Sequence, residues 1–247
     1  MKSETKPSHT EVEHVKNKSD YLRGTLVESL ANTVTGALNP EDTHLIKFHG
    51  SYQQTDRDLD SERKIQKLEP LYSFMIRVRV PGGVATPAQW LRMDALADKY
   101  ANGTLKLTTR QAFQLHGVRK RHLKPAIRGF NEVLLDSLAG CGDVSRNVMC
   151  SPNPEESRVH AAVQEVARSI SANFTPRTTA YYEIWLDGQP VDKSQPFATH
   201  KPGGADEEPV YGKTYLPRKF KIALAVPPQN DTDVFANDIG LIAIEKN

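Results

Sequence analysis

The order of the predicted elements between residues 72 and 150 constrains the fold of this chain more than any other feature. The run 74–80 alternates apolar side chains with Met, Arg and Arg, which is typical of a half-buried strand. A Thr-Pro start followed by apolar residues at helical spacing predicts a helix over 87–101. Two short runs, 104–109 and 112–118, predict a pair of strands joined by a tight turn.

A second helix and a last strand complete this unit. The helix is predicted to begin at Pro125, after the basic loop 119–124, and a glycine-rich stretch ends it before the short strand 146–150. The order strand, helix, strand, strand, helix, strand is the ferredoxin-like βαββαβ pattern, in which two helices cover one face of an antiparallel sheet. The sequence therefore predicts an α+β fold with a ferredoxin-like half-domain over residues 69–150.

The segments before this unit have weaker patterns. Residues 1–18 are charged and have no helical or strand period, so they are predicted to form a disordered arm. Residues 19–68 contain a short strand-like run and many hydrogen-bonding side chains, which favours an extended segment that wraps over another domain.

A second unit begins after residue 151. An amphipathic helix over 159–170 is followed by a predicted strand at 180–188 and a loop over roughly 189–210. Two further strands are predicted within 215–226 and 240–244. Residues 151–247 are therefore interpreted as the first part of a mixed α/β domain that is incomplete.

Composition excludes several classes of function. The formal net charge is only +2, so no dominant field for a nucleic-acid partner is expected. No apolar run has membrane-spanning length and the start is too polar for a secretory signal, which predicts a cytoplasmic protein with no membrane partner. The two cysteines, Cys141 and Cys150, are too few for a four-thiolate cluster or zinc site, so no metal ligands are predicted and both are interpreted as reduced thiols.

Basic side chains recur at the ends or on one face of the predicted strands and could converge on one anionic ligand. Arg binds oxyanions through its planar fork, and Lys adds a compact charge and a transferable proton. Taken singly, each of these residues is typical of a surface charge, and a lone His is more often structural. The set is Arg77, Arg79, Lys106, Arg110, His116, Arg146, Arg218, Lys219 and Lys221. Trp90, Met93 and Tyr100 are instead interpreted as core packing.

Four longer stretches resemble successive motifs of one family. They are FHGSYQQTDRD (48–58), LTTRQAFQLHG (107–117), SRNVMCSPNP (145–154) and YLPRKFKIALAVPPQND (215–231), and SDYLRGT and FANDIG fit the same pattern. In order and spacing they are similar to the assimilatory sulfite reductase hemoprotein family. The resemblance runs from about residue 19 to the end and covers about the first half of the family's usual chain.

The resemblance implies reduction of sulfite to sulfide at a siroheme coupled to a [4Fe–4S] cluster, with electrons from a flavoprotein subunit or a ferredoxin. It implies that residues 151–247 begin the siroheme-binding domain. The family's cluster-binding cysteines lie beyond residue 247, and Cys141 and Cys150 do not match them. The chain is therefore expected to need a missing carboxy-terminal half.

The resemblance also implies roles for individual residues. Arg77, Arg146, Lys219 and Lys221 are expected to surround the sulfite as catalytic residues. The cofactor-binding residues are expected to be Gln54, Lys106, Arg110, Gln114, His116, Arg146 and Lys221. Such a set suits an oxyanion that loses its oxygens as water, because this needs positive charge for binding and nearby acids for protonation.

Two alternatives remain beside sulfite reduction. Nitrite reduction by the same cofactor pair is a rival within the family, although the YLPRKFK motif favours sulfite. A non-catalytic RNA-binding module shares the βαββαβ order, but the run 112–118 offers only Phe113 as an aromatic platform for bases.

Overall fold

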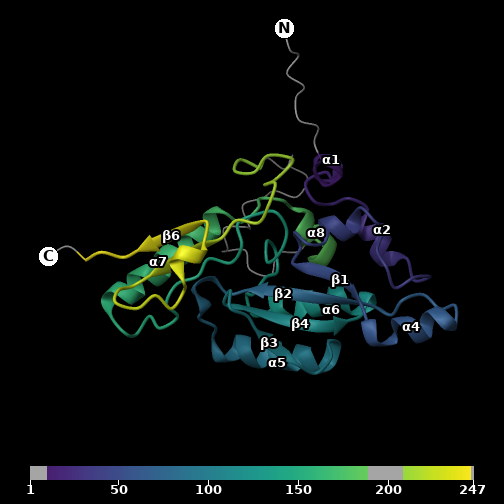
Figure 1. The fold of residues 1–247 in the computed structure, drawn as a ribbon, viewed down its shortest axis with the longest axis horizontal. Helices are drawn as coiled ribbons and strands as arrows, with labels where there is room; N and C mark the ends of the chain where they lie inside the picture. Colours follow the sequence, from purple (N-terminus) through teal and green to yellow (C-terminus); the bar gives the residue numbers. More distant parts are fainter. Residues whose placement is uncertain (1–9, 189–207, 246–247) are drawn as a thin grey trace, which may run out of the picture.

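The computed structural model describes residues 10–188 and 208–245, and its main body is a four-stranded antiparallel sheet. The strands lie in the order β1-β2-β4-β3, and helices α5 and α6 contact the sheet and each other. Figure 1 shows α5 running along the lower side of this sheet. The bounds are β1 (Ser51–Thr55), β2 (Tyr72–Arg79), β3 (Leu105–Leu107), β4 (Ala112–Val118), α5 (Pro87–Tyr100) and α6 (Lys120–Asn131). This arrangement confirms the predicted α+β class.

Alternation along β2 decides which face of the sheet is buried. Phe74, Ile76 and Val78 are fully buried against the two helices, as the sequence predicts. Burial of side chains of this size contributes roughly 1.5–3 kcal/mol each to stability. The opposite face of the sheet therefore presents the polar residues of the same strands.

The predicted start of α5 is confirmed, and its apolar stripe is partly corrected. Thr86 accepts a hydrogen bond from the backbone of Gln89, and the Gln89 side chain returns one to Thr86, which forms a capping box. Met93 is fully buried, but Trp90 is 45% exposed and packs edge to face on Phe113. Trp90 therefore lies at the rim of the core, whereas the sequence predicted it inside.

The predicted strand at 146–150 does not join the main sheet. Met149 makes an isolated parallel bridge to Ala223 instead, and Ser145, the residue before the run, makes another to Phe220. The edge beside β2 is filled by β1, which comes from the upstream segment and pairs over five residues. The last strand of the predicted βαββαβ order is thus wrong, because backbone hydrogen bonds draw these residues toward the second unit.

The second helix of the unit begins earlier and ends earlier than predicted. It starts at Lys120, so the predicted basic loop forms its first turns, and Pro125 lies inside it. Lys and Arg have good helix propensity, which favours this start. The helix ends at Asn131, and Leu134 has a positive φ of 60° and is 54% exposed.

The predicted strand at 180–188 is a helix, α8 (Ala180–Leu186). Short apolar runs are ambiguous between strand and helix, and here Tyr181, Ile184 and Trp185 are buried at helical spacing. The Trp185 indole N–H donates to Nδ1 of His49 at 2.9 Å, and His49 Nε2 lies 2.8 Å from the carbonyl oxygen of Leu22. This contact fixes α8 against the amino-terminal segment.

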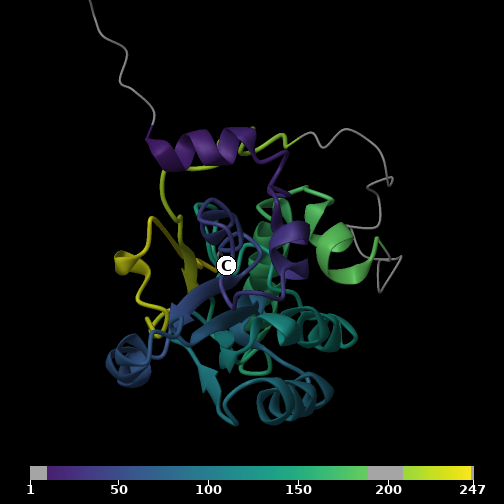
Figure 2. The same ribbon diagram turned by 90° about the vertical axis from the view of Figure 1, so that its right-hand side faces the viewer.

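The amino-terminal segment is more ordered than predicted. Residues 11–18 form α1 (Glu11–Lys18), and the buried Lys16 donates to the carbonyl oxygen of Leu216 at 2.8 Å. Figure 2 shows α1, the purple helix at the top, lying beside the yellow-green segment that precedes β5. The segment 19–68 is not extended throughout, since it contains α2 (Leu26–Ala31), α3 (Asp42–Leu45), β1 and α4 (Arg57–Ile65). Residues 1–9 lie outside the described residues.

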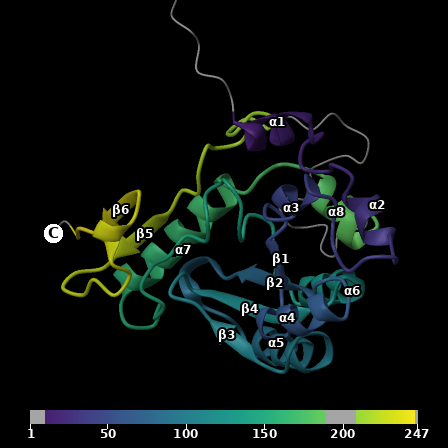
Figure 3. The ribbon, with the colours of Figure 1, turned by 45° about the vertical axis from the view of Figure 1, so that its right-hand side comes forward.

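A second unit packs around one helix at the other end of the molecule (Figure 3). Helix α7 (Arg158–Asn173) contacts β5 (Ile222–Ala225), which pairs in parallel with β6 (Ile239–Ile242). Both strands are shorter than the runs that predicted them. Two short 3₁₀ turns, η1 (Pro81–Gly83) and η3 (Val234–Ala236), complete the described elements. The predicted loop at 189–210 lies almost wholly outside the described residues.

His49 gives the fold a measurable pH dependence. Burial lowers the pKa of His49 from 6.5 to about 4. The ring is therefore neutral when folded, and the stability that this contributes is present above pH 6.5 and is lost as pH falls toward 4. We expect urea titrations to show a loss of about 3 kcal/mol over this range.

The matched control is His49→Gln, which keeps one donor and one acceptor but does not titrate. Its free energy of unfolding should fall less over the same pH range. Equal pH slopes in the two proteins would contradict the role given to His49.

Candidate anion-binding site

The face of the main sheet away from the helices carries a row of polar side chains. Arg77 in β2 lies opposite Gln114 in β4, and Lys106 in β3 lies opposite Gln114 on its other side. Directly opposed residues on one sheet face have Cβ atoms about 4.5–5.5 Å apart. Three of the residues expected in the site are therefore neighbours across three strands.

Gln114 connects Arg77 to His116. With the amide of Gln114 oriented to satisfy both of its ends, its oxygen accepts from Arg77 Nη2 at 2.7 Å and Nε at 3.0 Å, and its nitrogen donates to His116 Nε2 at 3.1 Å. Burial, then the charges of Lys106 and Arg77, lower the pKa of His116. His116 is therefore a neutral ring at pH 7, and the positive charge of this row belongs to Arg77 and Lys106.

Arg77 and Arg146 meet at one backbone oxygen. Arg77 Nη1 lies 3.4 Å and Arg146 Nη1 lies 3.5 Å from the carbonyl oxygen of Gly140, and Arg146 Nε donates to Gly142 O at 2.8 Å. A Cβ on Gly140 would lie 2.5 Å from the carbonyl oxygen of Arg77, so only glycine allows this approach. Two guanidiniums that are far apart in sequence are thus held side by side, with further donors that can face an anion.

Tyr52 and Cys141 belong to the same cluster and were not expected as site residues. Arg77 Nη1 donates to Cys141 Sγ at 3.1 Å. Tyr52 lies opposite Met75 on the sheet face away from the helices, which carries Arg77 and Lys106 and is called the cationic face below. Burial raises the pKa of Cys141 despite the two arginines, so the side chain is a thiol at neutral pH. Burial also raises the pKa of Tyr52, and a hydrogen bond with Arg146 opposes this. The sequence feature that could have indicated Tyr52 as a site residue is its position in the motif 48–58, which also contains Gln54.

Arg110 and Lys221 form a second group, held by the turn before β6. Arg110 Nη1 donates to the carbonyl oxygens of Asn147 and Ile222, both at 3.3 Å, and Nη2 contacts Asn237. Lys221 Nζ donates to Ala236 O at 3.2 Å. Burial lowers the pKa of Arg110, and the charge of Asp238 opposes this. Both cations are anchored by the FANDIG motif.

The two lysines expected around sulfite do not alternate on a regular strand. Lys219 is exposed and Lys221 is half-buried, and both precede β5. They flank Phe220, whose carbonyl oxygen accepts the backbone N–H of Arg146 at 2.8 Å. The segment that carries them is therefore fixed beside Arg146 by backbone hydrogen bonds.

Two of the basic residues predicted from the sequence, Arg79 and Arg218, take no part in these groups. Arg79 is buried and makes two-pronged hydrogen bonds to Asp136. Gln54 and Lys106 lie on the cationic face with exposed side chains, and Arg218 is exposed as well. Arg79 is thus structural.

The described residues contain no group that could hold a metal through three or more His, Cys, Asp or Glu side chains. Cys150 is buried and donates to Gln164 Oε1 at 2.9 Å, away from the partners of Cys141. Burial raises the pKa of Cys150 to about 11. Both cysteines are therefore buried, protonated thiols.

Comparison with known proteins identifies the class to which this fold and cationic face belong. Two family models match: the nitrite/sulfite reductase ferredoxin-like half domain over residues 66–133 and the nitrite and sulphite reductase 4Fe-4S domain over residues 165–247. A solved structure of the Mycobacterium tuberculosis NirA protein has the same fold, with a TM-score of 0.58, 21% identity, and coverage of 95% of this chain and 37% of that one. Dissimilatory sulfite reductase I matches with a TM-score of 0.52 at 13% identity, covering 99% of this chain and 53% of that one.

Curated relatives narrow the class. The sulfite reductase (NADPH) hemoprotein beta-component of Staphylococcus saprophyticus is 59% identical over 96% of this chain and 40% of its own length. The beta-components of Geobacillus kaustophilus (60% identical, 95% and 40%) and Myxococcus xanthus (59% identical, 99% and 41%) match to the same extent. The chain belongs to the nitrite and sulfite reductase family and is similar to the hemoprotein beta-components of NADPH sulfite reductases. It spans about two fifths of the length of these relatives.

Proposed function

We propose that this chain is the amino-terminal portion of a sulfite reductase hemoprotein, which reduces sulfite to sulfide in assimilatory sulfur metabolism. The observation that carries the proposal is the meeting of Arg77 and Arg146 at the carbonyl of Gly140, on the sheet face that also presents Lys106. Paired guanidiniums suit an oxyanion because their forks match its oxygens. The chain's share of the enzyme is therefore the anion-binding wall of the active site.

The donor set fits a cofactor with several carboxylates. Arg77, Lys106 and Arg110 would hold siroheme, together with Gln54, Gln114, His116, Arg146 and Lys221. When bound, siroheme coupled to a [4Fe–4S] cluster supplies the iron and the electrons for reduction of sulfur. The described part of this chain offers no cluster ligands, so the cluster would be held by the carboxy-terminal half.

The chain's own residues would bind the anion and supply protons. Arg77 and Arg146 bind the oxyanion and orient it, since both are held rigidly by backbone carbonyls. Lys219 and Lys221 are the proton donors, because an ammonium can both attract an oxygen and give it a proton. Gln114 keeps Arg77 in place and holds the neutral His116 against it.

The exposed surface of the second unit supports a missing half as partner. Parallel sheets are normally covered on both faces. The parallel pair of β5 and β6 is not, since apolar side chains in β6 or just after it are exposed, including Leu241 (41%), Ile242 (49%) and Ile244 (82%). Such an apolar edge needs further structure to cover it. The curated relatives have that additional length.

The electron donor is proposed to be a flavoprotein subunit, with ferredoxin as the alternative. The names of the curated relatives contain NADPH, which supports the flavoprotein. No helix among the described residues is long and apolar enough to cross a membrane, and we propose a cytoplasmic location.

The RNA-binding alternative is not favoured. Phe113, the one aromatic residue that could have served as a platform for bases, is 3% exposed and packs on Trp90 on the helix side of the sheet. The cationic face would thus contact RNA without a stacking surface.

Turnover of the two anions separates sulfite reduction from nitrite reduction. The chain is co-expressed with the part of the Geobacillus kaustophilus beta-component that follows the matched region, and sulfide and ammonium formation are measured with a reduced dye as donor. We expect a higher kcat/KM for sulfite than for nitrite. A clear preference for nitrite would transfer the assignment to the nitrite reductases of the family.

A further inference from the structure

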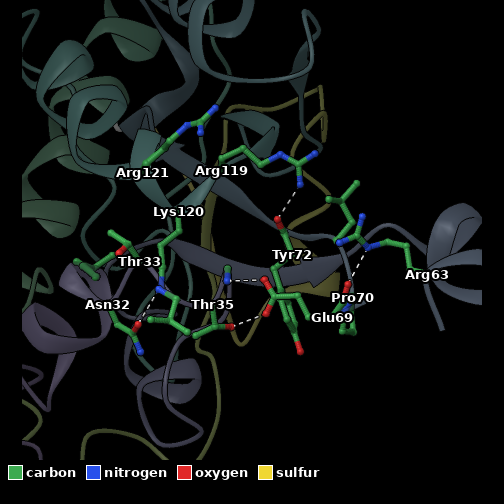
Figure 4. A pocket seen from close by; sticks show the side chains of 14 residues that line it. Asn32, Thr33, Thr35, Arg63, Glu69, Pro70, Tyr72, Arg119, Lys120 and Arg121 are labelled. Carbon is green, nitrogen blue, oxygen red and sulfur yellow. Dashed lines mark hydrogen bonds between the residues drawn. The ribbon is translucent and has the colours of Figure 1, made fainter. Parts of the chain in front are cut away.

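A cavity of about 460 Å³ lies at the edge of the main sheet, apart from the anion-binding site (Figure 4). It is formed by the start of β2, the segment after α2, the end of α4 and the first turn of α6. Tyr72 lines it, and Arg77 lies five positions further along the same strand. At roughly 3.4 Å per residue the two sites are about 17 Å apart, so this cavity is a separate site.

The cavity concentrates positive charge in a chain that is nearly neutral. Arg63, Arg119, Lys120 and Arg121 line it, and Glu69 is the one carboxylate among the lining residues. Figure 4 shows the three basic residues of α6 and its cap on one side and Arg63 on another, with Glu69 and Tyr72 between them. A partner with negative charge is therefore expected.

The carboxylate of Glu69 is already satisfied by the loop that follows α2. It accepts the Thr35 hydroxyl at 2.7 Å and the Gly36 N–H at 2.9 Å. Lys120 is also engaged, since its Nζ donates to the carbonyl oxygens of Ser29 at 3.1 Å and Ala37 at 2.9 Å. These two residues shape the wall of the cavity, and the arginines are the charged side chains that can bind a ligand there.

The arginines keep free donors toward the cavity. Arg119 uses Nη1 on the Tyr72 carbonyl oxygen at 2.9 Å, and Arg63 uses Nε on the Glu69 carbonyl oxygen at 2.7 Å. A guanidinium has five N–H donors, so each is positioned by one bond while its others remain available within the described structure. Arg121 is exposed at the same opening, and it uses Nε on His122 Nε2 at 3.3 Å.

The start of α6 adds to this arrangement. The helix has twelve residues and begins at Lys120, and the cap residue Arg119 provides no side-chain hydrogen bond to its first turn. The first N–H groups of a helix and its dipole favour an anion. The guanidiniums and the helix start thus act on the same space.

We propose that this cavity binds a small molecule that carries a phosphate group, held by Arg63, Arg119 and Arg121. Phosphate offers more acceptor oxygens than a carboxylate and matches several guanidinium forks at once. Asn32 and Thr33 line the remainder of the cavity and can bond the hydroxyls of an attached group. The volume lies in the range of small-molecule sites. The proposal goes beyond sulfite reduction and does not depend on it.

Calorimetric titration of the chain at about 0.15 M ionic strength tests this site, with inorganic phosphate and glycerol 3-phosphate as separate probes. We expect at least one probe to bind, and Arg63→Ala/Arg121→Ala to weaken binding by about tenfold or more, because each charged hydrogen bond contributes that much or more. The matched control is Lys64→Ala/Lys99→Ala, which removes the same charge from exposed positions outside the cavity. It should bind within about twofold of the parent chain, since surface charges act weakly at a distance in salt.

The two probes distinguish the source of the phosphate. Tighter binding of glycerol 3-phosphate assigns the site to a phosphate ester, and equal binding assigns it to the phosphate group alone. Circular dichroism melts of both double variants establish that they are folded. Failure of both probes to bind at about 10 mM, or equal weakening by the two double variants, overturns the proposal.

Discussion

Replacing Arg77 with alanine is expected to lower kcat/KM for sulfite by about a hundredfold in the enzyme completed with a carboxy-terminal half. The side chain is held by Gln114 and by the carbonyl of Gly140, beside Arg146. Loss of two charge-assisted hydrogen bonds to the anion, at roughly 1.5–3 kcal/mol each, gives an effect of this size or larger. Initial rates of sulfide formation over a range of sulfite concentrations provide the measurement.

Two variants make this result specific. Arg77→Lys keeps the charge but not the fork, so its kcat/KM should lie between those of the parent and Arg77→Ala. Lys99→Ala, on the exposed side of α5, should leave the rate within about twofold. The role of Arg77 is excluded if Arg77→Ala retains full kcat/KM while remaining folded.

Replacing Asp136 with alanine is expected to cost about 3 kcal/mol of stability. Arg79 is 5% exposed and is bonded by Asp136 at 2.8 and 2.9 Å through Nη2 and by Thr175 at 2.9 Å through Nη1. Removing the carboxylate leaves a buried guanidinium with one neutral partner, which is strongly destabilising. The Asp136 side chain is 30% exposed, so the lower end of the usual range applies. Urea denaturation of the chain measures this loss.

A double replacement and a surface pair serve as controls. Arg79→Met/Asp136→Leu removes both charges and should recover most of the loss, because an apolar pair of similar volume needs no desolvation of ions. Arg168→Ala breaks a surface pair with Glu165, whose side chains are 49% and 72% exposed, and should change stability by less than about 1 kcal/mol. Equal effects of Asp136→Ala and Arg168→Ala would contradict the structural role of Arg79.

Local patterns predicted the elements that depend on local interactions. Strand β2 follows from its alternation, and α5 from its Thr86 cap and Pro87. The edge of the sheet could not be predicted in this way, because the mainly polar β1 occupies it while the more apolar run 146–150 does not, and only long-range pairing decides this. The prediction of a strand at 180–188 was wrong because its apolar residues fit the period of a strand as well as that of a helix.

The candidate site was predictable to the extent that it lies on regular strands or in motifs. Arg77, Gln114 and Lys106 come together as the strand order requires. Their convergence with Arg146 depends on the close approach at Gly140, which no sequence spacing reveals. Tyr52 was missed for the same reason, since β1 was not expected beside β2. The contacts of Arg110 and Lys221 with the turn at 236–238 likewise could not be predicted from the sequence, because they join segments that only the fold brings together.

The most direct test of the central claim is the visible absorption spectrum and sulfide production of the chain expressed alone and with the complementary half, in cells that make siroheme. The claim is that this chain supplies an anion-binding wall but no cluster ligands. The chain alone should form no sulfide, and the complemented protein should show siroheme absorption and reduce sulfite. A stable siroheme-containing protein that reduces sulfite from the isolated chain would contradict the account.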